Sequence, residues 1–165
     1  MGLEKENTAK ERCLELISFH FWRREIISKL LHEVDEAYFE KKLPGSFGSL
    51  YIILNHLVWA EKVWLGRVNH DELATMKPSN TKGLLEAWEA VAEKWENVIK
   101  NADKNAFDQP ITYFNSTGDQ FENSILEIVI HMVDHSTYHI GQMMNAVRGF
   151  GIEPVSTNYI HYLRS

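Results

Sequence analysis

The chain has 165 residues, of which 44% are hydrophobic and 24% are charged, and its formal net charge is −6. This length suits one hydrophobic core, and the composition excludes a disordered or repetitive chain. We therefore expect a single domain over residues 1–165. The acidic balance disfavours nucleic acid as a partner, because affinity for phosphate backbones comes largely from Lys and Arg that release counterions.

The sequence predicts no membrane span and no internal disulfide. Its most apolar run, residues 50–60, is interrupted by Asn55 and His56. That run is also shorter than the roughly 18 apolar residues that indicate a spanning helix. Cys13 is the single cysteine, and the N-terminal residues are polar where a signal peptide would be apolar. We expect a cytoplasmic protein without a membrane anchor.

The first part of the chain predicts two helices. Between Glu11 and Lys42, apolar residues recur at helical spacing, which is typical of one long amphipathic helix. Pro44 should end this helix, because proline cannot continue the backbone hydrogen-bond ladder. A second helix is expected from residues 46–49 to Asn69, and it is apolar on nearly all sides. Such a helix belongs at the centre of a bundle or in an oligomer contact.

The rest of the chain predicts two more helices and a hairpin. After a polar connection over residues 70–80, apolar spacing from Leu84 to Ile99 indicates a third helix. Strand-forming residues on both sides of the turn cluster 115–119 predict a short hairpin after Pro110.

A fourth helix should begin at a capping box formed by Ser124 and Glu127, and end at Gly149 or Gly151. Residues 158–163 are expected to add a turn or two that docks on the bundle. The predicted fold class is therefore all-α, a four-helix bundle with a short β-hairpin between its third and fourth helices.

The candidate chemistry lies in the fourth helix, where His131, His135 and His139 recur every four residues. Positions four apart share one helix face, with side chains about 5–6 Å apart. Metal–nitrogen bonds are only about 2.0–2.1 Å long, whereas His131 and His139 are separated by roughly 12 Å of helix axis. Spacing therefore leaves two candidate pairs, His131 with His135 or His135 with His139.

His56 is the best third ligand from another helix, because it lies in an apolar stretch where a free imidazole is costly to bury. Three protein ligands leave a position open for water or substrate, which is the pattern of catalytic sites. The alternative is a structural role, with each imidazole hydrogen-bonded to a carbonyl or a water in the core. The pattern is not that of a zincin, since Ser136 follows His135 where H-E-x-x-H requires Glu.

The run His135-x-x-x-His139-Ile-Gly-Gln142 resembles the H-x-x-x-H-R-G-Q motif of the DinB/YfiT-like family. The stretch that ends at His56, followed by Glu61 and Trp64, is similar to the metal motif in the second helix of that family.

The resemblance covers most of the chain, because it extends through residues 46–47, 113–119 and 158–164. The chain departs from the family at Ile140, where Arg is usual, and at Arg23-Arg24, where Ala-Asn is common.

The resemblance implies a four-helix bundle, often homodimeric, that binds zinc, nickel or a related divalent ion through His56, His135 and His139. It places His131 beside the ligands or in a pocket. Gln142, Tyr138 and Tyr113 are further pocket candidates. Trp59 and Trp64 could line a substrate pocket, but Trp at helical spacing is more often buried, so we expect both in the core. Met132, Met143 and Met144 are expected there too.

Proteins similar to this chain include thiol-cofactor transferases and hydrolases. The resemblance therefore implies a metal-dependent hydrolase or thiol S-transferase that acts on a small molecule, with a low-molecular-weight thiol as a candidate co-substrate. No carboxylate stands beside the histidines at a spacing that identifies a general base. The alternative is a non-catalytic binding or stress-response module that the metal stabilises. A role in DNA repair would rest on the family name alone, and the acidic charge disfavours it.

Overall fold

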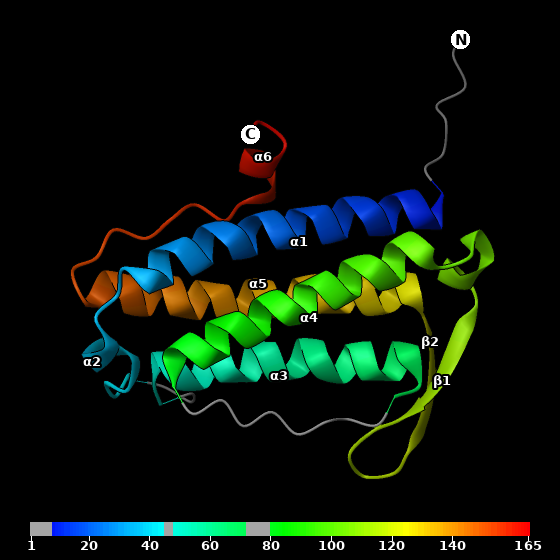
Figure 1. Ribbon diagram of the computed structural model, residues 1–165, viewed down its shortest axis with the longest axis horizontal. Coiled ribbons are helices and arrows are strands. Elements are labelled where there is room, and N and C mark those ends of the chain that lie inside the picture. The colour runs from blue at the N-terminus through cyan, green and yellow to red at the C-terminus, as the bar shows by residue number, and fades with distance from the viewer. Residues whose placement is uncertain (1–7, 45–47, 72–79) are drawn as a thin grey trace.

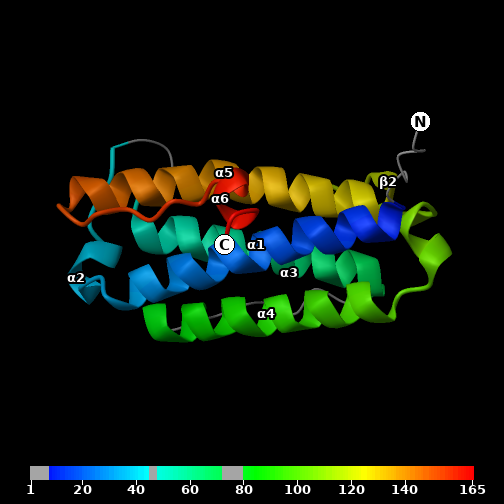
Figure 2. The same ribbon diagram turned by 90° about the horizontal axis from the view of Figure 1, so that it is seen from above.

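The computed structural model describes residues 8–44, 48–71 and 80–165. Four long helices in this part of the chain lie side by side in an elongated bundle (Figure 1, Figure 2). They are α1 (Ala9–His32), α3 (Leu50–Asn69), α4 (Thr81–Asn101) and α5 (Ile125–Gly149). The smaller elements are α2 (Glu36–Phe39), the 3-10 helix η1 (Lys104–Phe107), β1 (Pro110–Phe114), β2 (Gln120–Ser124) and α6 (Tyr159–Tyr162). The predicted four-helix bundle with a hairpin between its third and fourth long helices is confirmed.

The first predicted helix is interrupted, and this part of the prediction is wrong. Helix α1 ends at His32, and the short helix α2 begins at Glu36. The break occurs at Asp35, whose side chain accepts a hydrogen bond from the backbone N–H of Ala37 at 2.9 Å. Aspartate favours such a cap over a helix interior, because its short side chain competes for nearby backbone donors.

Helix α3 begins after Ser49, whose side chain accepts a hydrogen bond from the N–H of Ile52 at 3.3 Å. The beginning predicted at residues 46–49 lies partly outside the described residues, and so does most of the connection predicted over 70–80. The helix packs against both α4 and α5. Its central place in the bundle follows from the apolar residues on nearly all its sides.

One side of α3 is not covered by a neighbouring helix. Ile52 is 49% exposed and Trp59 is 50% exposed, so the prediction that Trp59 lies in the core is wrong. A helix that is apolar all round buries only the sides that its neighbours reach. Trp64 is partly buried against the core, and the three methionines of α5 are buried as predicted.

The hairpin and the fourth long helix agree with the sequence. Strands β1 and β2 pair antiparallel, with Pro110 opposite Ser124 and Phe114 opposite Gln120. The predicted capping box is formed: the N–H of Glu127 donates to the Ser124 hydroxyl at 3.2 Å, and the N–H of Ser124 donates to the Glu127 carboxylate at 2.8 Å. Helix α5 ends at Gly149, one of the two predicted glycines.

The C-terminal tail docks on α1 as predicted. The ring of Phe19 lies 5.0 Å from that of Tyr159 and 5.6 Å from that of Tyr162, between ring centroids. The Tyr159 hydroxyl also donates a hydrogen bond to Glu15. None of the helices in the described ranges is long and apolar enough to cross a membrane.

Candidate metal centre

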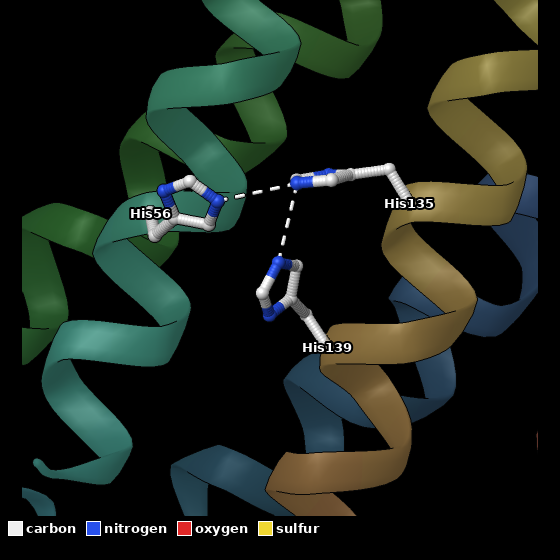
Figure 3. A group of neighbouring side chains, drawn as sticks. All are labelled: His56, His135 and His139. Atoms are coloured by element: carbon white, nitrogen blue, oxygen red, sulfur yellow. Dashed lines mark hydrogen bonds between the residues drawn. The ribbon is translucent and has the colours of Figure 1, made fainter. Parts of the chain in front are cut away.

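Helices α3 and α5 run antiparallel and side by side, and they carry the histidines of the candidate site (Figure 1). Helix α3 contributes His56, while α5 contributes His135 and His139 from successive turns. The side chains point toward one another across the space between the two helices (Figure 3). The tertiary fold therefore brings together residues that lie 79 positions apart in the sequence.

His135 occupies the middle of the cluster. Its Nε2 atom lies 3.2 Å from Nε2 of His56 and 3.2 Å from Nε2 of His139 (Figure 3). Each of the three rings offers one nitrogen that lies within 4.8 Å of the other two. Among the described residues, this is the group of His, Cys, Asp and Glu side chains with the spacing of a metal site.

Hydrogen bonding within the cluster does not account for both short contacts. The Nε2 atom of a neutral imidazole has either one proton or one lone pair. Nε2 of His135 can therefore form one good hydrogen bond, although it has two nitrogen neighbours at 3.2 Å. The convergence of three lone pairs on a single cation accounts for both contacts at once.

Two of the three nitrogen–nitrogen distances also suit a divalent ion, and the third is within 4.8 Å. Two nitrogens that each lie about 2.0–2.1 Å from a tetrahedral ion are about 3.3 Å apart. Both contacts of the His135 nitrogen, at 3.2 Å, match this separation. The described residues thus include a three-imidazole group that can hold one metal ion.

The surroundings of His135 and His56 lower the pKa of both rings and so favour the neutral imidazole, the form that binds metal. Burial, followed by the charge that neighbouring histidines would carry, lowers the pKa of His135 from 6.5 to about 4. The negative charge of Glu61 acts in the opposite direction, but its effect is smaller. Burial also lowers the pKa of His56, with a further contribution from His139.

Gln142, a pocket candidate from the sequence, contacts the cluster directly. Its side-chain oxygen lies 2.9 Å from Nδ1 of His139, one turn earlier on α5. With this amide orientation the Nδ1–H of His139 donates to Gln142, and Nε2 is left as the lone-pair nitrogen that faces His135. Gln142 therefore selects the tautomer that a metal ligand requires.

His131 lies outside the cluster. Its side chain is exposed, its ring centroid is 5.8 Å from that of His135, and it packs edge to face on Trp64 at 5.1 Å. Of the two pairs that the spacing left open, the fold brings His135 with His139 to His56. Tyr138 is 60% exposed and packs edge to face on the ring of His139 at 4.9 Å.

A buried polar network beside the site was not predicted. One carboxylate oxygen of Glu61 accepts hydrogen bonds from Nε2 of His20 at 2.9 Å and from the indole of Trp88 at 3.0 Å. The guanidinium of Arg23 donates to Nδ1 of His20 at 3.1 Å and to the carbonyl oxygen of Val133 at 2.8 Å. These bonds connect all four long helices, including the two that carry the histidine cluster.

Arg23 is 1% exposed, although two adjacent arginines usually lie on a solvated helix face. A pattern in the sequence could have revealed this. His20 and Arg23 continue the spacing of Ile17 and Ile27, so all four lie on the buried stripe of α1. A polar pair on an apolar stripe requires buried partners, and Glu61 on α3 is the acidic one.

Comparison with known proteins agrees with this architecture. The chain is 22% identical over 162 residues to Protein DinB of Bacillus subtilis (strain 168), which covers 92% of this chain and 93% of that protein. The crystal structure of a DinB-like protein from Bacillus cereus ATCC 10987 superimposes with a TM-score of 0.67 at 17% identity, over 86% of this chain and 94% of that chain. The DinB family model matches residues 5–165. The chain therefore belongs to the DinB family.

Proposed function

We propose that this protein is a metal-dependent enzyme that binds one divalent ion through His56, His135 and His139. The observation that carries the proposal is the convergence of three imidazole nitrogens, with Nε2 of His135 at 3.2 Å from both of the others. The reaction is either hydrolysis of a small molecule or transfer of a small electrophile to a thiol.

The residues of the cluster have distinct tasks in this proposal. His135 and His139 supply two ligands from one face of α5, and His56 closes the set from α3. Gln142 keeps the proton of His139 on Nδ1. Tyr138, which packs on His139 and is exposed, forms part of the rim past which a substrate enters.

Zinc and nickel are the first candidates for the ion, because both bind imidazole well. Such an ion supplies Lewis-acid chemistry, by lowering the pKa of a water or thiol that reaches it and by polarising an electrophile. A thiol would have to come from outside the protein. Cys13 is fully buried, and burial raises the pKa of its thiol to about 12.

The second candidate is a binding or stress-response module in which the metal stabilises the bundle without turnover. The three-histidine geometry supports this role equally well, because a ligand that binds the folded state raises stability by mass action. The two candidates differ in activity. The enzyme should turn over a substrate in its metal-loaded form. In the binding module, metal should raise the melting temperature without any turnover.

The decisive experiment measures metal content and turnover in matched variants. The wild type, His135→Ala and His131→Ala should be purified, analysed for bound metals, and titrated with Zn²⁺ and Ni²⁺ by calorimetry. His131→Ala is the matched control, since it removes an exposed imidazole one turn away on the same helix. We expect about one ion per chain in the wild type and the control, and none in His135→Ala.

The same proteins should be assayed with low-molecular-weight thiols plus electrophiles, and with ester and amide panels. Turnover by the wild type and by His131→Ala, lost in His135→Ala, would support the enzyme. Metal binding without any turnover above His135→Ala would favour the binding module. Equal metal content in all three proteins would overturn the proposed centre.

A homodimer accompanies this proposal. The exposed apolar side chains of Ile52 and Trp59 lie on one side of α3, and burial of such surface drives association of identical chains. Light scattering should give twice the chain mass. A monomeric mass at working concentrations would contradict the dimer without affecting the metal site.

A further inference from the structure

A pocket of ≈ 310 Å³ lies near the histidine cluster, toward the end of the bundle at which α2 connects to α3. Ile53 of α3 and several side chains of α5 line two of its sides, and residues 41–44 and 48 line another. Its volume falls at the lower end of the range for small-molecule sites, which is about 300–1,000 Å³. Its lining includes Lys41, Lys42, Ile53, Gln142, Asn145 and Phe150.

The two helical walls continue into the cluster. Ile53 lies three residues before His56, and Gln142 lies three residues after His139. Three residues correspond to about 4.5 Å of helix axis. Because α3 and α5 are antiparallel, both steps lead in the same direction along the bundle (Figure 1). The side chain of Gln142 lines the pocket and contacts His139, so one residue belongs to both sites.

The pocket has the charge of an anion site. Its charged lining residues are Lys41 and Lys42, and no carboxylate lines it among the described residues. This positive lining contrasts with the net charge of −6 of the whole chain. The ammonium of Lys41 lies 5.3 Å from the ring centroid of Phe150 and 5.4 Å from that of Tyr38, so aromatic faces help to position it.

A backbone hydrogen bond joins Leu43 and Gly48, two described residues that line the pocket. The N–H of Leu43 donates to the carbonyl oxygen of Gly48 at 2.7 Å. Gly48 has a φ of 74°, which side chains rarely allow, and a Cβ there would lie 3.3 Å from the side chain of Ile52. Glycine therefore permits the close approach of residue 48 to Ile52 of α3.

We propose that this pocket binds the anionic end of the substrate. The ligand class is a small molecule with a carboxylate or phosphate group that Lys41 and Lys42 recognise, and an apolar body that packs on Ile53 and Phe150. The rest of the molecule extends past Gln142 toward the three histidines. The assignment as a substrate site rests on the proposed function, whereas the binding of anions by the pocket can be tested separately.

The test is a titration of the full-length protein, followed by the backbone amide resonances in ¹H–¹⁵N spectra. The probes are 3-phenylpropionate, phenyl phosphate and the neutral 3-phenylpropanamide. We expect the anionic probes to shift the resonances of Lys42, Gln142 and Asn145. The amide should bind about tenfold more weakly, which corresponds to roughly 1.4 kcal/mol for one charge-assisted hydrogen bond. Comparison of the two anions distinguishes a carboxylate site from a phosphate site.

The matched variants are Lys41→Gln/Lys42→Gln and, as a control with the same change of charge, Lys82→Gln/Lys94→Gln on the exposed side of α4. The first should bind the anions about tenfold more weakly and the amide unchanged, and the control should behave like the wild type. Equal anion affinity in the two double variants, or shifts confined to residues outside the pocket, would overturn the pocket proposal.

The metal content and the anion affinity of these variants distinguish a failure of the pocket proposal from a failure of the proposed metal centre. If Lys41→Gln/Lys42→Gln retains metal but binds the anions like the wild type, the pocket proposal alone is wrong. If His135→Ala retains metal and the lysine variant still loses the anions, the proposed metal centre is wrong and the anion pocket stands.

Discussion

The side-chain oxygen of Gln142 lies 2.9 Å from Nδ1 of His139 and orients that ring toward the other two histidines. A partner of this kind keeps the proton on one ring nitrogen and leaves the other for a metal. It also connects the cluster with the neighbouring pocket, since Gln142 lines both.

Replacement of Gln142 should weaken metal binding without unfolding the protein. We expect Gln142→Leu to lower the affinity for Zn²⁺ by about 10–100-fold, the usual effect of losing a partner that orients a ligand. Gln142→Glu retains an acceptor and should largely restore the affinity, and Asn145→Ala, one turn further along α5, is the control. Calorimetric titration measures all three. An affinity of Gln142→Leu equal to that of Asn145→Ala would show that the contact has no role in binding.

The metal-free protein should lose stability in mild acid. The pKa of His135 is lowered from 6.5 to about 4 in the fold, so the folded state prefers the neutral ring. The contribution of His135 to the free energy of unfolding is fully present above pH 6.5. It declines as the pH falls toward about 4, because the unfolded chain then takes up the proton more readily than the folded chain.

Urea unfolding in the presence of a chelator tests this expectation. The wild type should lose more stability between pH 7 and pH 4.5 than His135→Gln, which has no titrating ring at this position. The comparison between variants cancels the effects of carboxylates elsewhere. Identical pH profiles would mean that protonation of His135 does not destabilise the metal-free folded state.

The buried hydrogen-bond network of Glu61, His20 and Arg23 should contribute far more to the free energy of unfolding than exposed ion pairs do. Burial lowers the pKa of Arg23 to about 10, so its guanidinium is still charged at pH 7. Glu61→Gln removes the negative charge that compensates it, and we expect a loss of about 3 kcal/mol in the free energy of unfolding. Glu25→Gln, which breaks an exposed pair with Lys29, should cost less than about 1 kcal/mol. Chemical denaturation of both variants makes the comparison, and equal losses would contradict it.

Cys13 should be inert in the folded protein. Its side chain is fully buried, and burial is the main cause that raises the pKa of the thiol to about 12. Because the thiolate is the reactive form, we expect no reaction with an aromatic disulfide reagent at pH 8 before unfolding, and complete reaction in denaturant. Rapid labelling of the native protein would show that α1 opens locally.

Features that depend on neighbouring residues in the chain could be predicted from the sequence. The capping box at Ser124, the hairpin around residues 115–119 and the helical face shared by His135 and His139 all follow from local spacing. The break at Asp35 is also local. The apolar periodicity continues through it, however, so the hydrophobic pattern predicted one uninterrupted helix.

The tertiary structure decided which distant residues meet. Spacing alone left His131 and His139 as equal partners for His135, and only the packing of α3 on α5 brings His56 within reach of one pair. The burial of Arg23 with Glu61 and the pocket that Lys41 and Gln142 both line also depend on how the helices pack. The physical reason is that helical periodicity specifies a face of each helix, whereas the neighbour of that face is set by how all the helices fill one core.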